Sequence, residues 1–311
     1  MITVDPIDIR GAMVTSSTVP YPDTGETAWS GASVGYVVGD TRSYLVGTDY
    51  YRFECITAHT SSATNYPVPK PNETVNWLDL GFVNKFAMFQ LERNTQTIET
   101  TSPLIVEVDP GDRVGVIGLG NLEADGVQLD IYDSGGTLVS TATKDLIDRY
   151  VASWYSYFYQ PFRQIVNTLF SDIAIDATYT FKLTFTKATG SVKVGAVVCG
   201  MPYDIGSAQY QAKVRRLNFS TFDRAFDGET TITIRRNVPK VNLNLFIDKT
   251  ALNGIVRLID DLNGVVTLWA GLVTTTDGYF ESVFLIGIYK DIEYSLDYPN
   301  HAVGAIEVEA L

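Results

Sequence analysis

Few residues of this 311-residue chain are of types that commonly carry out catalysis. Histidine occurs only as His59 and His301, so a histidine-based catalytic triad has just two candidates. His59 follows an alternating apolar run and His301 follows a Pro-Asn turn, and both settings favour structural roles. The sequence has no G-x-S-x-G or H-E-x-x-H motif and no Cys/His cluster with metal-ligand spacing. We therefore expect no catalytic residue, no cofactor and no metal site, and we expect the protein not to be an enzyme.

Carboxylates, in contrast, are abundant and lie on successive turn segments. A glycosidase uses two of them beside the scissile bond, and a calcium ion takes several oxygen ligands. No EF-hand loop is present and acidic turns are usually solvated, so both alternatives stay open without being favoured. The residues concerned are Asp109, Asp112, Glu123, Asp125, Asp130 and Asp133.

Aromatic side chains between residues 29 and 89 suggest a different chemistry, which is sugar binding. The apolar C–H face of a pyranose can lie against an exposed aromatic ring, as other apolar groups do. Trp29, Tyr50 and Trp77 are the predicted carbohydrate-binding residues. The alternative is that both tryptophans are buried, because a unit of about fifty residues needs large side chains to build a core.

The elements that would position these residues are mainly β. Aromatic residues make up 12% of the chain, and Thr and Val are frequent, which favours strands. We predict an extended N-terminal arm (1–27), a small carbohydrate-module-like β domain (28–85), a central jelly-roll β-sandwich (86–203) and a C-terminal β-rich docking domain (204–311). The jelly roll is predicted from short apolar or alternating runs that Asp/Gly/Pro turns separate at regular intervals.

One helix is expected in the C-terminal domain, over residues 250–263. Leu252, Ile255, Ile259 and Leu262 recur at helical spacing and Gly264 follows the end. The runs 230–236 and 240–247 before it suggest a strand pair that turns at residues 237–239. The aromatic run 154–162 is expected to be core or, better, a subunit interface, since interfaces favour Tyr, Trp and Phe.

Charge and apolarity exclude several partners. The formal net charge is −13, and the only basic pairs, Arg215-Arg216 and Arg235-Arg236, are expected to be solvated strand ends. Nucleic-acid binding is therefore disfavoured. No apolar run is long enough for a membrane span, and the N-terminus does not resemble a signal peptide. Cys55 and Cys199 are expected to be buried thiols, although a disulfide between them stays open.

Residues 29–77 resemble the small chitin- and cellulose-binding modules of secreted bacterial glycosidases. The resemblance covers about a sixth of the chain and departs at Thr41-Arg42 and in the long loop before Trp77. It implies a glycan-binding module. The matching positions are Trp29, Tyr36, Gly39, Asp40, Tyr44, Gly47, Tyr51, Cys55, His59, Thr60 and Trp77.

A second resemblance covers most of the chain and is to structural proteins of tailed-bacteriophage tails, a family often described as carbohydrate-binding tail proteins. It departs at Gln90 and over 215–222. It implies a tail-tip or baseplate component. The segments that carry it are Trp77–Phe89, Tyr132–Gly136, Trp154–Phe162, Gly195–Gly200, Ile286–Pro299 and Ala305–Leu311.

The expected function is thus structural. The chain would assemble with other phage tail or baseplate proteins, form a homo-oligomeric ring and bind a host cell-surface glycan through its N-terminal module. It would be made in the host cytoplasm and reside in the tail of the virion. The alternative is a polysaccharide-degrading enzyme or its accessory glycan-binding subunit.

Overall fold

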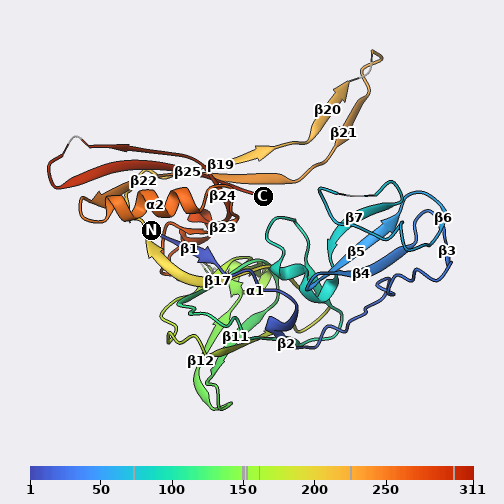
Figure 1. The fold of residues 1–311 in the computed structure, drawn as a ribbon. Helices are drawn as coiled ribbons and strands as arrows, with labels where there is room; N and C mark the ends of the chain where they lie inside the picture. Colours follow the sequence, from blue (N-terminus) through green and yellow to red (C-terminus); the bar gives the residue numbers. More distant parts are fainter. Residues whose placement is uncertain (73, 149–150, 152, 161, 225, 297) are drawn as a thin grey trace. The chain divides into compact units, whose positions relative to one another are not determined.

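The structure is a computed structural model that describes residues 1–311 except 73, 149, 150, 152, 161, 225 and 297 (Figure 1). It is mainly β, as predicted. The chain forms two compact units, one made of residues 7–200 and the other of residues 1–6 with 201–311.

The larger unit contains a jelly roll, which confirms that prediction. One sheet has the strand order β8-β17-β10-β15, and the five-stranded second sheet has the order β12-β11-β16-β9-β2. Taken along the chain from β8, successive strands alternate between the two sheets except at β11–β12, which is the connectivity of two Greek keys. The strands are β8 (Thr97–Glu99), β9 (Leu104–Val108), β10 (Val116–Glu123), β11 (Gly126–Tyr132), β12 (Leu138–Asp145), β15 (Thr168–Phe170), β16 (Thr180–Thr186) and β17 (Val192–Asp204), with β2 (Val14–Ser17) at the edge.

Alternation of apolar residues explains the packing of this sandwich. In β9, Leu104, Val106 and Val108 are buried while the residues between them are half-buried. In β16, Phe181, Leu183 and Phe185 follow the same period of two. These inward faces join one hydrophobic core, as two sheets packed face to face require. Within the segment predicted as an arm, β2 pairs with β9 and so extends the second sheet.

A small β domain in the same unit lies between β2 and β8. Its three-stranded sheet is β4 (Thr41–Val46), β5 (Asp49–Cys55) and β7 (Trp77–Phe82), and a two-stranded ribbon is β3 (Gly35–Tyr36) with β6 (His59–Thr60). β4 and β5 form a hairpin in which Val46 pairs with Asp49. Gly47 in its turn has φ +64°, a conformation that glycine adopts without strain.

Shorter elements complete the larger unit. Two 3₁₀ segments flank the small domain, and a short helix lies on the connection between two paired strands. They are η1 (Gly11–Met13), η2 (Asn84–Phe89), β13 (Ile147–Asp148), α1 (Trp154–Tyr159) and β14 (Arg163–Gln164).

The smaller unit is an antiparallel sheet covered by the predicted helix. Val241, Leu243, Leu245 and Ile247 alternate along β22 and share a core with Ile255 of α2. The sheet order is β1-β23-β24-β25-β22, with β18 and β19 on the other side of β22. The elements are β1 (Ile2–Pro6), β18 (Ser207–Ala208), β19 (Lys213–Asn218), β22 (Asn237–Asp248), α2 (Leu252–Asp261), β23 (Thr267–Ala270), α3 (Phe280–Val283), β24 (Phe284–Ser295) and β25 (His301–Ala310).

The pairing predicted around residues 237–239 is wrong. Residues 237–248 form one continuous strand, β22, whose first half pairs with β19, while β20 (Thr221–Arg224) pairs with β21 (Thr230–Thr233). Pro239 is tolerated inside β22 because pairing with β25 begins only at Lys240. The turn therefore includes residues 226–229, and the hairpin is far longer than the sequence suggested. It projects from the sheet in Figure 1.

Candidate functional site: an aromatic row on the small β domain

The core of the small domain is built from four fully buried residues, Tyr36, Phe53, Cys55 and Trp77. Trp77 has no exposed surface, and its ring lies edge-on to Tyr36 at 5.1 Å between centroids. A ring with no exposed face cannot stack on a sugar. Trp77 is therefore a core residue, and its prediction as a stacking residue is corrected, because its ring fills the space between the sheet and the β3–β6 ribbon, against Tyr36 and His59.

Trp77 nevertheless organises the loop beside it. Its indole Nε1 donates to the carbonyl of Asn65 at 3.1 Å. The Asn65 side chain donates to the carbonyl of Thr60 and accepts from the amide of Ser62. These bonds fix the loop at Asn65, and Tyr66 follows directly. Trp77 thus acts as a positioning residue for Tyr66.

Tyr50 lies elsewhere on the domain. Its ring stacks on Phe86 of η2 at 5.9 Å with an interplanar angle of 7°, and it contacts Tyr21 at 4.4 Å. These contacts attach it to the hydrophobic core of the jelly roll. No ring contact joins Trp29, Tyr50 and Trp77 directly to one another within the described residues, so the structure does not bring the three predicted residues together.

Trp29 belongs to a different group, a row of three rings with Tyr44 and Tyr66. The amide of Trp29 donates to the carbonyl of Ser43, which sets residues 27–29 alongside β4. The Trp29 ring meets Tyr44 edge-on at 5.3 Å, and Tyr44 meets Tyr66 at 5.9 Å. Trp29 and Tyr44 are half-buried, and Tyr66 is 42% exposed. We call Trp29, Tyr44 and Tyr66 the aromatic row.

The row combines ring faces with free polar atoms. Neither the Tyr44 nor the Tyr66 hydroxyl is bonded to another residue in the described part of the chain. The Trp29 indole N–H is buried and also lacks a partner there, which costs about 1–3 kcal/mol. A surface that offers apolar ring area together with hydroxyl groups matches the two sides of a sugar ring.

Alternation along the chain predicts that Tyr44 helps to fill the core, and Tyr44 does pack, half-buried, against the cluster of Tyr36, Phe53, Cys55 and Trp77. The sequence did not single out Tyr66. Tyr66 was detectable, because an aromatic residue in a loop rich in Pro, Ser and Asn has no strand partner of its own.

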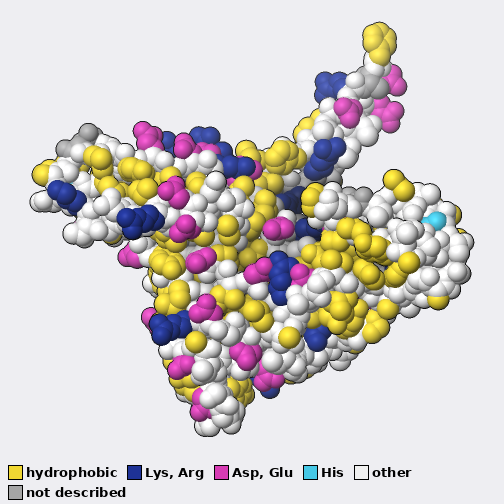
Figure 2. All heavy atoms as spheres, viewed as in Figure 1, with side chains coloured by type: hydrophobic (Ala, Val, Ile, Leu, Met, Phe, Trp, Pro, Cys, Tyr) yellow, Lys and Arg dark blue, Asp and Glu magenta, His cyan; other side chains and the backbone are white. Residues whose placement is uncertain are grey.

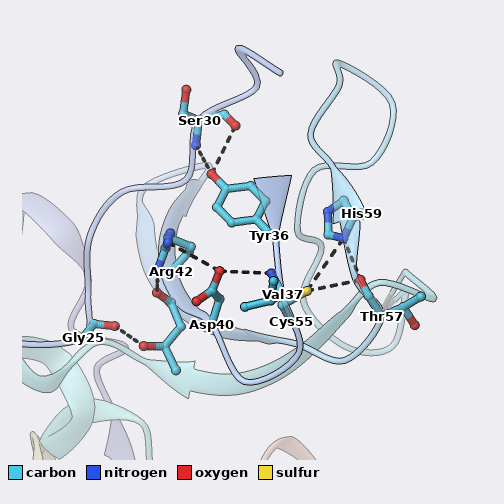
Figure 3. Close-up of polar contacts among 10 residues, drawn as sticks. Gly25, Ser30, Tyr36, Val37, Asp40, Arg42, Cys55, Thr57 and His59 are labelled. Atoms are coloured by element: carbon cyan, nitrogen blue, oxygen red, sulfur yellow. Dashed lines mark hydrogen bonds and ion pairs between the residues drawn. The ribbon is translucent and has the colours of Figure 1, made fainter. Parts of the chain in front are cut away.

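Polar contacts of Tyr36, Asp40 and Arg42 hold the segment that follows Trp29 (Figure 3). The Tyr36 hydroxyl accepts from the amide of Ser30 at 2.9 Å, which anchors the residue after Trp29. The guanidinium of Arg42 lies 5.0 Å from the Tyr36 ring centroid and 3.7 Å from the Asp40 carboxylate. The Asp40 carboxylate also accepts from the Val37 amide at 3.1 Å. The loop that carries Trp29 is thereby tied to β4.

Figure 3 also shows a cysteine and a histidine near each other, which raises the question of a nucleophile. Cys55 Sγ lies 3.7 Å from His59 Nδ1, but both groups point to the carbonyl of Thr57, at 3.2 and 2.8 Å. A carbonyl only accepts hydrogen bonds, so both groups are donors and the histidine does not act as a base toward the thiol. Burial also raises the pKa of the Cys55 thiol. The pair is arranged as a structural contact.

The acidic turns of the jelly roll divide into two groups. Asp130 is buried and bonded to Gln128 and Thr141, while Glu123 pairs with Lys193 and Lys187. Asp109 and Asp133, in contrast, line one open groove. Among the described residues, no group of three or more His, Cys, Asp or Glu is placed to hold a metal ion.

The remaining predicted features lie at the surface or in contacts of their own. His301 is stacked between Phe246 and Tyr298, with centroids 4.5 and 4.4 Å away, which is a structural role. The rings of α1 are 61–80% exposed, so that segment is not core; Pro161, in the same predicted run, lies outside the described residues. Cys55 and Cys199 are both free and buried, and no disulfide joins them.

Among the helices that the structure describes, none has the length and apolarity to cross a membrane. Comparison with known proteins adds no identification. No protein-family model matches the chain, and no curated protein matches it significantly.

Proposed function

We propose that this chain is a structural component of a bacteriophage tail tip or baseplate, which assembles with other tail proteins and binds a host-surface glycan through its small β domain. The observation that carries the assembly role is the long hairpin of the smaller unit. All residues of β21 and most of β19 and β20 are exposed. A hairpin with little buried surface is marginally stable in isolation, so it gains stability from a partner.

The exposed rings of α1 support the same proposal. Trp154, Tyr155 and Tyr159 are at least 73% exposed on a helix of six residues. Aromatic residues of this kind are enriched at protein interfaces and depleted on ordinary surfaces. The sequence segments that resemble tail proteins of tailed phages give the proposal its biological setting.

The assembly role is tested by locating the protein. Antibody raised against the purified chain would be used for gold labelling of phage particles released by the cells that encode it. We expect labels clustered at the tip of the tail. Particles that infect normally and carry no label would refute a virion role.

The aromatic row supports the glycan-binding role, which is tested separately. Retention on chitin, cellulose and host envelope glycans would be compared for the wild type, Tyr66→Ala and the control Tyr210→Ala, whose ring is 96% exposed in the other unit. One lost ring contact of about 0.5–1.5 kcal/mol weakens retention roughly 2- to 10-fold. Equal retention by all three proteins would count against the row as the site.

The same row would serve an accessory glycan-binding subunit of a polysaccharide-degrading enzyme, the second candidate. Gold labelling separates the two, because such a subunit has no reason to remain on the particle. Release of soluble sugar from any of the three glycans would instead favour a polysaccharide-degrading enzyme over both binding roles.

A further inference from the structure

The hairpin of the smaller unit has features that indicate the chemistry of its partner. We call residues 213–240, from β19 through β20 and β21 to the start of β22, the arm, which is distinct from the N-terminal segment 1–27. Within the described part of the arm, only Leu217, Ser220, Thr221 and the final residues 238–240 are half-buried, and every other residue is exposed. The arm thus has two open faces.

Apolar side chains are concentrated near the free end of the arm. Phe222 and Ile232 are directly opposite each other across the β20–β21 pair, and both are more than half exposed. Phe226 in the turn and Ile234 are exposed to an even greater extent. An apolar cross-strand pair that is exposed to water contributes less to stability than the same pair when it is buried, because its apolar area is not removed from solvent. This end therefore favours contact with another surface.

Charge distinguishes the arm from the rest of the chain. The arm carries seven Lys and Arg against three Asp and Glu, a net charge of +4, in a chain whose net charge is −13. The remaining residues therefore carry −17. Within the described chain, no carboxylate forms an ion pair with Arg216, Arg224, Arg235 or Arg236. Figure 2 shows Lys and Arg side chains along the arm and hydrophobic side chains at its end.

A surface of the opposite character exists on the jelly roll. A groove of about 840 Å³ is lined by Glu107, Asp109, Tyr132, Asp133 and Lys182, among others. It forms where the turn after β9, the turn between β11 and β12 and the segment before β16 meet, because these three connections lie at the same end of a jelly roll. None of the three carboxylates is in an ion pair within the described residues.

The groove also suits the type of cation that the arm supplies. Arginine is planar, binds carboxylates through two parallel hydrogen bonds and stacks on aromatic rings. Glu107, Asp109 and Asp133 provide the carboxylates, and Tyr132 provides a ring. The arm supplies two adjacent arginines, Arg235 and Arg236, that have no carboxylate partner of their own. The charges of the arm and of the groove are therefore complementary, with Lys182, opposite Glu107 in the β9–β16 pair, as the one cation among the described residues that line the groove.

We propose that the arm of one copy of this chain docks in the acidic groove of a second copy. The proposal deepens the assembly role and rests on it. Each copy would present one arm and one groove, so the contact is heterologous, and contacts of this kind generate closed rings or open filaments. The second copy is favoured over other partners because the acidic surface that complements the arm is present on the chain itself.

The test is a charge swap followed by mass measurement. Sedimentation would be recorded for the full-length wild type, Arg235→Glu/Arg236→Glu on the arm, Glu107→Lys/Asp109→Lys in the groove, and all four substitutions together. Arg257→Glu, an exposed arginine of α2, is the matched control. Far-UV circular dichroism and thermal unfolding would verify that each variant is folded.

We expect a wild-type oligomer that dissociates toward the 34.3 kDa monomer as salt is raised. Each charge-reversed variant should weaken self-association at least about tenfold, the control should not, and the combined variant should recover most of the loss. Folded variants that associate as the wild type does would overturn the proposal, and so would failure of the combined variant to recover.

Failure of this inference is distinguishable from failure of the assembly role. A wild type that is monomeric at all concentrations, yet is labelled at the tail tip, would overturn the second copy as partner and leave the assembly role intact. A monomer that shifts only when a short DNA duplex is added would assign the arm to nucleic acid and also overturn the proposal.

Discussion

Replacing Trp77 by alanine should destabilise the small β domain while all three residues of the aromatic row are kept. Trp77 is fully buried and belongs, with Tyr36, Phe53 and Cys55, to the hydrophobic cluster of the described part of that domain. Truncation of a buried tryptophan costs about 3–5 kcal/mol, and loss of the bond to the Asn65 carbonyl adds about 1 kcal/mol. The lower end of this sum, about 4 kcal/mol, already raises the open population roughly a thousandfold.

Amide hydrogen exchange read by mass spectrometry measures this opening locally. Peptides from β5 and β7 should lose protection by about that factor, while peptides from β9 and β16 of the jelly roll should not change. Trp29→Ala is the matched control, because its half-buried ring should cost far less. Trp77→Phe keeps most of the packing and loses the N–H donor, so it should lie between the two. Unchanged protection of β5 and β7 in Trp77→Ala, or equal losses in Trp29→Ala, would refute the assignment of Trp77 to the core.

Three further outcomes are expected. Burial raises the pKa of the Glu26 carboxyl, so the stability that Glu26 contributes is fully present below its unfolded pKa of about 4.5 and is lost as pH rises through its folded pKa. The difference in unfolding free energy between the wild type and Glu26→Ala, measured by urea titration, should therefore fall as pH rises over this range. A difference that does not change with pH would contradict the prediction. Burial raises the pKa of the Cys55 thiol and raises the pKa of the Cys199 thiol to about 12. A thiol reagent at pH 8 should therefore label neither cysteine until urea unfolds the protein. Rapid labelling of the native protein would show that the thiols are accessible. Asp79→Ala should lower the unfolding free energy by about 3 kcal/mol, because the Asp79 carboxylate is buried and bonded to Arg93 at 2.5 Å. Thermal unfolding measures the change, and an unchanged melting temperature would contradict the prediction.

Much of the jelly roll was predictable because its signals are local. Strands such as β9 and β16 alternate over a few residues, and the turns between strands contain Asp, Gly or Pro, as at Asp133-Ser-Gly-Gly. The helix over 252–261 was predictable for the same reason, since its apolar period and following glycine lie within fifteen residues. In both cases the residues that specify the element are the residues that form it.

The arm was mispredicted because its pairing is not local. Asn237-Val-Pro looks like a turn, yet β22 pairs there with β19, whose residues lie about twenty positions upstream. Which of two competing registers forms depends on partners such as β25, on the other side of β22, and these have no trace in the local pattern. The sequence showed two basic pairs and could not show that a long exposed hairpin carries both of them.

The candidate site was predictable in kind but not in its members. Trp29 and Trp77 are the same residue type in similar surroundings, and only the tertiary structure decides that β7 turns Trp77 inward while Trp29 stays at the edge. Trp29 remains a predicted binding residue, and the rings in its row are those of Tyr44 and Tyr66 instead of Tyr50 and Trp77.

The distribution of exposed rings indicates where recognition is concentrated. The two sheets of the jelly roll share one hydrophobic core, while Leu138 and Val139 of β12 stay exposed. The small domain has more rings than its core can enclose, because a unit of its size buries only about 60% of its surface. The surplus appears as the aromatic row, and α1 and the arm carry comparable surpluses. Exposed aromatic area that is not balanced by local packing is maintained at a cost in solubility. The aromatic row, α1 and the arm, together with exposed tyrosines such as Tyr210 and Tyr279, are therefore the surfaces at which we expect contacts with other molecules.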